Sequence, residues 1–111
     1  MSRKKKENEI DTAKDTAFRF LSYRSRSVLE VKRKLQEKEF SPHTIRATLS
    51  RLMELGYLND QEYAAAVARS SIENKQWGPI RIHDALVKKG IAKDIIDNTL
   101  EELAKEYDLT R

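Results

Sequence analysis

The sequence contains no cysteine and very little glycine or proline, and these absences exclude several kinds of protein. Without cysteine the chain has no disulfide framework, no thiolate metal site and no cysteine nucleophile. Three glycines, two prolines and no stretch of alternating β-branched residues favour an all-α fold. No apolar run approaches the roughly 20 residues that a membrane-spanning helix needs. We therefore expect a soluble, cytoplasmic, helical protein.

The sequence also lacks the residue patterns of a catalytic or metal site. Its two histidines, His43 and His83, lie 40 residues apart and form no cluster with other candidate ligands. There is no Ser/His/Asp order, no pair of carboxylates around a Gly-rich loop and no phosphate-binding glycine motif. We predict that the chain is not an enzyme and binds no metal or cofactor.

Positive charge is concentrated in the first half of the chain. Residues 1–56 carry 14 Lys and Arg against 8 Asp and Glu, whereas residues 57–111 carry 8 against 10. The basic half begins with Arg3-Lys4-Lys5-Lys6, and we expect residues 1–9 to form a basic flexible arm. Such charge attracts nucleic acid or an acidic protein surface.

The chain contains an internal repeat with a period of 51 residues. This shift places Ser27–Leu58 on Gly78–Leu109 without a gap, and apolar residues meet apolar residues. We expect one three-helix repeat over residues 10–58 and a second over residues 59–111. Two copies of one helical unit predict an elongated molecule that binds a large partner along a surface rather than in a pocket.

Local signals indicate where the helices begin and end. The expected helices cover about 11–23, 27–38, 41–55, 59–75, 78–89 and 93–107. Ser27 and Glu30 form a capping box, and Ser41 caps the third helix with a proline at its first position. Gly56 and Gly90 are typical left-handed residues after a last turn. Three aromatic residues lie at helix ends or turns, Tyr57, Trp77 and Tyr107. We expect them to pack in the joints between helices.

A basic cluster surrounds the second helix and recurs in the corresponding zone of the second repeat. We predict that the following residues bind the partner: Arg24, Arg26, Arg33, Lys34, Lys38, Arg81, Lys88 and Lys89. A repeated basic helix forms a stripe that can follow a phosphate backbone or a recurring acidic groove. The alternative is a solvated charged face, partly neutralised by Glu30 and Glu37.

Two other functions fit parts of the pattern. Residues 41–58 also resemble a winged helix-turn-helix, in which the helix after Ser41 would enter the DNA major groove. Such a fold continues into two wing strands, whereas Asn59–Lys75 continues as an Ala-rich helical run. A DNA-binding protein of this type is the alternative to a partner-binding repeat protein. A helical scaffold that self-associates is the third hypothesis.

Three segments, taken in order, resemble the RecX family, bacterial regulators of the RecA recombinase. They are residues 24–35, 55–64 and 78–91. The first is the Arg-x-x-Ser-x-x-Glu helix start, the second a Gly-Tyr-Leu-Asn-Asp joint, and the third a Gly-Pro opening with a Lys-Gly-Ile stop. The residues of these motifs to which we assign structural roles are Ser27, Glu30, Leu35, Gly56, Tyr57, Leu58, Asp60, Gly78, Pro79 and Gly90.

The resemblance implies a curved chain of tandem three-helix repeats that binds in the helical groove of the RecA–DNA filament. It implies inhibition of the filament's ATPase and strand exchange, and hence a role in recombination, DNA repair and the SOS response. It further implies weak direct DNA binding in some members, no cofactor and no catalytic activity. Family members usually carry three repeats, whereas two are present here. We expect the chain to act as a monomer.

Overall fold

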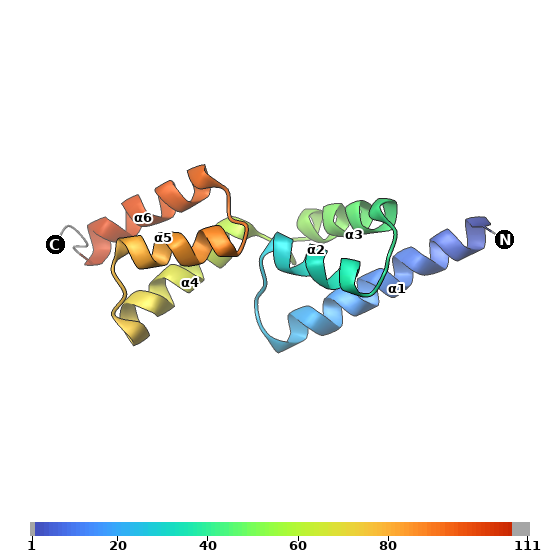
Figure 1. The fold of residues 1–111 in the computed structure, drawn as a ribbon, viewed down its shortest axis with the longest axis horizontal. Helices are drawn as coiled ribbons and strands as arrows, with labels where there is room; N and C mark the ends of the chain where they lie inside the picture. Colours follow the sequence, from blue (N-terminus) through green and yellow to red (C-terminus); the bar gives the residue numbers. More distant parts are fainter. Residues whose placement is uncertain (1, 108–111) are drawn as a thin grey trace. The chain divides into compact units, whose positions relative to one another are not determined.

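The fold is entirely helical over the part of the chain that the computed structural model describes, residues 2–107, with side chains from Glu9 onward. Its helices are α1 (Ser2–Tyr23), α2 (Val28–Glu37), α3 (Pro42–Glu54), α4 (Asp60–Lys75), α5 (Pro79–Lys88) and α6 (Lys93–Tyr107) (Figure 1). None of these helices combines the length and the apolar character that crossing a membrane requires. The all-α prediction is confirmed.

The helices group into two compact units, Met1–Asn59 and Asp60–Arg111, here called the first and the second unit. In the first unit α1 packs against α2 and α3, and α2 packs against α3. In the second unit α4, α5 and α6 make the same three pairings. Two three-helix units are therefore present. The repeat limits at residues 10–58 and 59–111, and an elongated, curved arrangement of the pair, stay predictions.

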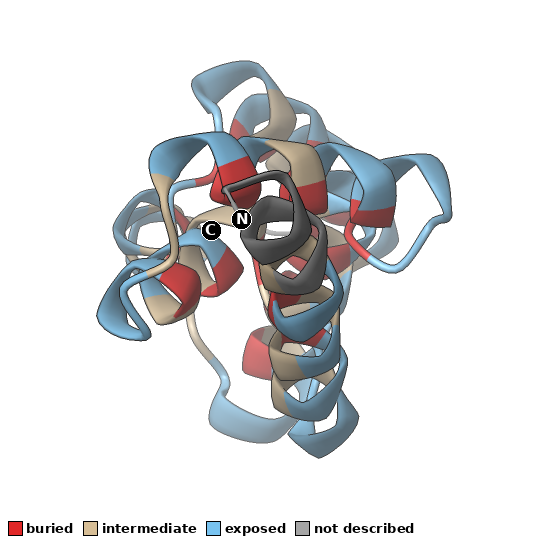
Figure 2. Ribbon diagram, turned by 90° about the vertical axis from the view of Figure 1, so that its right-hand side faces the viewer, coloured by how far each residue is buried: buried red, intermediate tan, exposed pale blue. Residues whose placement is uncertain are grey.

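Each unit has its own hydrophobic core, and the two cores follow the 51-residue period. The matched buried pairs are Ala13 with Ala64, Ala17 with Ala68, Val31 with Ile82, Leu35 with Leu86, Ile45 with Ile96, and Leu52 with Leu103. Buried positions recur along the helices between exposed ones (Figure 2). The two alanine pairs extend the repeat into α1 and α4, ahead of the stretch that the sequence alone aligned.

The predicted helix caps of the first unit are confirmed. The Oγ of Ser27 accepts a hydrogen bond from the Glu30 N–H at 3.2 Å, and Glu30 Oε1 accepts one from the Ser27 N–H at 3.0 Å. The Oγ of Ser41 accepts a hydrogen bond from the Thr44 N–H at 3.2 Å. Gly56 ends α3 with φ +82°. These bonds satisfy helix-end groups that have no partner inside the helix.

The same backbone turn closes α2 and α5, but with different residues. Gly90 has φ 78°, as predicted, whereas Glu39 at the matching position has φ 64°. After each helix an N–H reaches back five residues, from Phe40 to the Leu35 carbonyl at 3.2 Å in the first unit. Glu39 therefore occupies a left-handed conformation that costs an L-residue roughly 1–2 kcal/mol.

Helix α1 begins at Ser2, whereas the sequence predicted a flexible arm over residues 1–9 and a helix from about Asp11. Lysine and glutamate favour helix, and no glycine or proline interrupts residues 2–23. Glu9, the first residue whose side chain the structure describes, accepts a hydrogen bond from the backbone N–H of Ser41. The side chains of the basic run Arg3–Lys6 lie outside the described residues.

Helix α4 fills the place where a winged helix-turn-helix would form its wing. It begins at Asp60, one residue beyond the Gly56-Tyr57-Leu58 joint, and continues to Lys75. Residues 2–107 contain no strand. The described part of the chain therefore lacks the wing that this alternative requires.

Candidate partner-binding surface

Two of the predicted binding residues, Arg24 and Arg26, lie in the loop before α2 and contact their own unit. Arg24 Nη2 forms an ion pair with Glu30 Oε2 at 3.2 Å. The Arg26 guanidinium carbon lies 3.9 Å from the centre of the Phe20 ring. Stacking on a ring face stabilises a cation in place. Both arginines therefore help to fix the α1–α2 loop.

The three predicted cations of α2 and its C-cap, Arg33, Lys34 and Lys38, do not share one face. Lys34 and Lys38 are four residues apart and lie on the same side of the helix. Lys34 is half-buried, with its Nζ 3.7 Å from Glu37 Oε1 and 5.4 Å from the centre of the Phe20 ring. Arg33 and Lys38 are exposed and form no ion pair with any described residue. The structure thus separates Arg33 from the other two.

Lys34 and Lys38 line a groove between α1 and α2 with a volume of about 450 Å³. We call it the α1–α2 groove and define it by its lining residues, which are Thr12, Thr16, Arg19, Phe20, Tyr23, Lys34, Lys38 and Phe40. Three of these residues are cations, three are aromatic, and none is acidic. The groove cannot be recognised from the sequence alone, because Arg19 and Tyr23 belong to a different helix from the two lysines.

The cations of the second unit are arranged differently. Arg81 lies 4.7 Å from the centre of the Trp77 ring, and the Nζ of Lys75 lies 4.8 Å from the same point. Lys88 is exposed, whereas Lys89 is half-buried and has interactions within the structure. Arg81 is therefore occupied by an aromatic contact, as Arg26 is in the first unit.

Among the predicted binding residues, only Lys38 and Lys89 occupy matched positions of the two units. The 51-residue period places Lys38 on Lys89, but it places Arg33 on Asp84 and Lys34 on Ala85. Both units carry basic residues on their middle helix, yet a strictly repeated stripe is absent from their matched positions. The excess positive charge belongs to the first unit.

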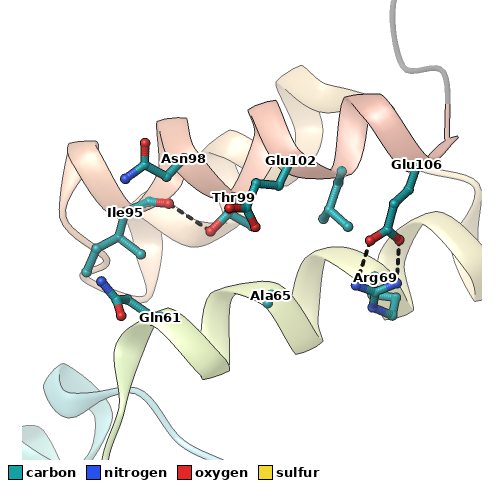
Figure 3. Close-up of a pocket in the computed structure, with 9 residues that line it drawn as sticks. Gln61, Ala65, Arg69, Ile95, Asn98, Thr99, Glu102 and Glu106 are labelled. Atoms are coloured by element: carbon teal, nitrogen blue, oxygen red, sulfur yellow. Dashed lines mark hydrogen bonds and ion pairs between the residues drawn. The ribbon is translucent and has the colours of Figure 1, made fainter.

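The second unit has a hollow of its own between α4 and α6, of about 270 Å³ (Figure 3). Figure 3 shows the Arg69 guanidinium facing the Glu106 carboxylate at its edge. The two N–O distances are 2.7 and 3.4 Å. Glu102 also lines the hollow. Two carboxylates against one guanidinium make it a poor site for an anionic partner.

Hydrogen bonds at the edge of this hollow shift the pKa values of Arg69, Glu106 and Tyr107. Arg69 donates to Glu106, and this bond holds the pKa of the carboxyl below its ordinary value. The Tyr107 hydroxyl donates to the Glu73 carboxylate, which raises the pKa of the phenol. Arg69 also donates to the Tyr107 oxygen at 3.3 Å. The group is an exposed clamp between α4 and α6, and all of its charges have partners.

Most of the predicted motif residues occupy structural positions. Ser27, Leu35 and Leu58 are buried, and Gly78-Pro79 and Asp60 begin helices. Trp77 and Tyr107 pack partly buried against the second core, as expected. Tyr57 does not, because it is 56% exposed and meets Phe18 edge to face at 4.8 Å. Among the described residues, no group of His, Asp and Glu is arranged to hold a metal ion.

Comparison with known protein families decides the affiliation of the chain. A family model for the first three-helix domain of RecX matches residues 13–52, and one for the second three-helix domain matches residues 59–100. The chain belongs to the RecX family. Its two units are thus the first and second RecX domains, in order, and the resemblance seen in the sequence is confirmed.

Individual RecX proteins match over most of the chain. Regulatory protein RecX of Bacillus subtilis (strain 168) is 39% identical over 100 residues, which are 90% of this chain and 36% of that protein. Regulatory protein RecX of Listeria innocua is 34% identical over 93 residues, which are 84% of this chain and 35% of that protein. The chain therefore spans about a third of the length of these relatives.

Solved RecX structures share the fold. The crystal structure of RecX from Lactobacillus salivarius superimposes with a TM-score of 0.82 at 27% identity, over 92% of this chain and 77% of that one. A second crystal structure, of a regulatory protein RecX, gives a TM-score of 0.83 at 27% identity, over 91% of this chain and 50% of that one. Two three-helix units in succession are therefore a RecX architecture.

Proposed function

We propose that the chain binds the RecA filament on DNA and inhibits its ATPase and strand-exchange activities, thereby modulating recombination, DNA repair and the SOS response. The observation that carries this proposal is the ordered match of both RecX domains, over residues 13–52 and 59–100. The matched relatives are named regulatory proteins, and regulation of RecA is what the resemblance to this family implies. The chain acts by binding, without a cofactor or catalysis of its own.

The distribution of charge supports binding to an anionic or acidic surface. The first unit is strongly basic, and the exposed cations Arg33, on α2, and Lys38, at its C-cap, form no ion pairs with described residues. A filament repeats the same surface along its axis, so a chain with two related units can contact neighbouring protomers. Contacts to two protomers would restrict the motion that ATP turnover requires. We expect the chain to bind the filament as a monomer, in the bacterial cytoplasm.

The test is the single-stranded-DNA-dependent ATPase of a bacterial RecA, with the chain titrated in. We expect inhibition at fewer chains than RecA protomers, because a chain that bridges protomers blocks more than one of them. A variant with a disrupted first core, Leu35→Asp, serves as the control in which the first unit is unfolded, and it should not inhibit. No inhibition at several-fold excess of a chain with intact helicity would contradict the proposal.

Binding to bare DNA must be measured beside the ATPase, because sequestration of the DNA would also lower turnover. Fluorescence anisotropy of a labelled single strand, without RecA, supplies this control. The proposal predicts inhibition at chain concentrations at which the bare strand is still unbound. Equal concentration dependence of the two signals would instead support the DNA-binding alternative.

A further inference from the structure

The α1–α2 groove concentrates positive charge around an apolar floor. Arg19 comes from α1, Lys34 from α2 and Lys38 from the C-cap of α2, and no acidic residue is among those that line the groove. Phe20 and Phe40 are half-buried and supply aromatic carbon between these cations. A ligand that fits the groove therefore carries negative charge at its edges and an apolar group between them.

The aromatic rings of the groove are poorly placed for stacking on nucleobases. The Arg26 guanidinium covers the Phe20 ring at 3.9 Å, and the Nζ of Lys34 lies 5.4 Å from the same ring centre. Single-strand binding uses open ring faces on which successive bases stack. Tyr23 is the one strongly exposed aromatic among the lining residues, with 79% of its surface exposed. The rings are therefore better suited to contact with an aliphatic side chain of a protein than to a stacked base.

The second unit shows that the fold does not require this groove. The 51-residue period matches the buried core residues of the two units, yet it places Arg19 on Ser70 and Lys34 on Ala85. Phe20 and Tyr23 fall on Ser71 and Asn74. The cores are alike, whereas only Lys38 among the three groove cations falls on a basic residue, Lys89, and none of the three rings falls on an aromatic one. That difference is what a binding site added to one copy of a repeat would produce.

The length of the groove fits a short protein segment. Its α1 residues extend from Thr12 to Tyr23, a rise of roughly 16 Å along the helix. About three turns of a partner helix cover this distance, and helices that lie in grooves present anchors at similar spacing. Lys34 and Lys38, one turn apart at the C-terminal end of α2, then face carboxylates one turn apart on the partner.

We propose that the α1–α2 groove docks an acidic protein segment that inserts an apolar side chain against Phe20 and Phe40, between carboxylates that pair with Arg19, Lys34 and Lys38. The inference rests on the proposed function in that the segment belongs to the recombinase. It identifies the first unit as the part of the chain that recognises protein. Because the contacts combine charge with apolar burial, added salt weakens binding without abolishing it.

The probe is a set of overlapping peptides of about 15 residues that span the RecA sequence, long enough to cover the groove as a helix. Anisotropy of the tightest-binding labelled peptide is measured with the wild-type chain and with Arg19→Glu/Lys38→Glu. The matched control is Lys32→Glu/Arg46→Glu, which makes the same change in charge at exposed positions outside the groove. Circular dichroism checks that all three proteins are equally helical.

The proposal expects the bound peptides to be acidic and to carry a large apolar residue. The groove variant should bind them roughly tenfold more weakly or worse, while the control stays within about twofold. A peptide with its acids replaced by lysine should prefer the groove variant. Binding by peptides without acids, or equal losses in both variants, would overturn the proposal. So would binding of a single-stranded oligothymidine that depends on Arg19 and Lys38 when no peptide binds.

The ATPase assay separates this inference from the proposed function. If the wild-type chain inhibits and the groove variant inhibits equally well, the groove inference fails and the proposed function stands. If the folded wild-type chain does not inhibit, the proposed function fails. Inhibition by the wild-type chain and the control, but not by the groove variant, supports both.

Discussion

The carboxylate of Glu9 accepts a hydrogen bond from the backbone N–H of Ser41 at 2.8 Å. Ser41 is the N-cap residue of α3, so the negative charge lies at the helix end that carries partial positive charge. The bond joins residues far apart in sequence and connects an early turn of α1 to the start of α3. It therefore belongs to the tertiary structure of the first unit, within the stretch that the sequence suggested to be an arm.

Replacing this acid should destabilise the first unit. Glu9→Ala leaves the partly buried Ser41 N–H without its partner and removes a charge from the helix end, which together cost about 1–2 kcal/mol. Urea unfolding followed by circular dichroism measures the change. Asp11→Ala, at an exposed position of the same helix, is the matched control and should have little effect. Equal effects of both changes would show that the bond contributes nothing specific.

The left-handed residue after α2 offers a stabilising substitution. Glu39→Gly relieves the strain at φ 64° and, after the entropy that glycine loses on folding, should raise stability by up to about 1 kcal/mol. The thermal midpoint measures this gain. Gly90→Ala, at the matching turn of the second unit, should have the opposite sign because φ is 78° there. A lower midpoint for Glu39→Gly would mean that the Glu39 side chain makes a stabilising contribution.

Two matched threonines should respond differently to the same change. The Thr99 hydroxyl donates to the Ile95 carbonyl at 2.7 Å, whereas the buried Thr48 hydroxyl bonds no described residue. Thr48→Val removes an unpaired polar atom and should stabilise the first unit by about 1 kcal/mol. Thr99→Val loses a hydrogen bond, so it should stabilise the second unit by less than Thr48→Val stabilises the first, or destabilise it. Denaturant midpoints of the two variants test the difference, and equal shifts would contradict it.

Acid should weaken the clamp between α4 and α6. The pKa of Glu106 is lowered in the folded chain by its hydrogen bonds from Arg69. Its contribution to stability is therefore present above the pKa of the unfolded chain and is lost as the pH falls through the lower, folded value. Glu106→Gln should remove this part of the acid sensitivity. The measurement is the drop in thermal midpoint between neutral and acidic pH, in the wild-type chain and in the variant. The drop should be slightly smaller in the variant, because the Arg69–Glu106 pair is exposed and contributes little.

The elements that sequence reasoning predicted correctly are those with local causes. The Ser27–Glu30 capping box and the turn at Gly90 depend on residues within a few positions of each other, so their chemistry can be read from the chain. The turn at Glu39 was missed because glutamate rarely adopts positive φ, and packing of the whole unit imposes the conformation there.

The candidate site was predicted less well, because it depends on which helices meet. Arg26 and Arg81 were assigned to a partner, yet each lies over an aromatic ring of its own unit. Arg19 and Tyr23 were not singled out, although they line the α1–α2 groove with Lys34. Charge counts identified the basic half of the chain, but the pairing of α1 with α2 was needed to show where its charge gathers.

The two separate cores have a consequence for biosynthesis. Each core is assembled from one continuous stretch of the chain, Met1–Asn59 or Asp60–Arg111, so its closing contacts join residues that are near in sequence. Such local topologies fold quickly. Synthesis proceeds at about 5–20 residues per second, and domains fold as they emerge. We therefore expect the first unit to acquire its native form on the ribosome before the last helix of the second has been translated.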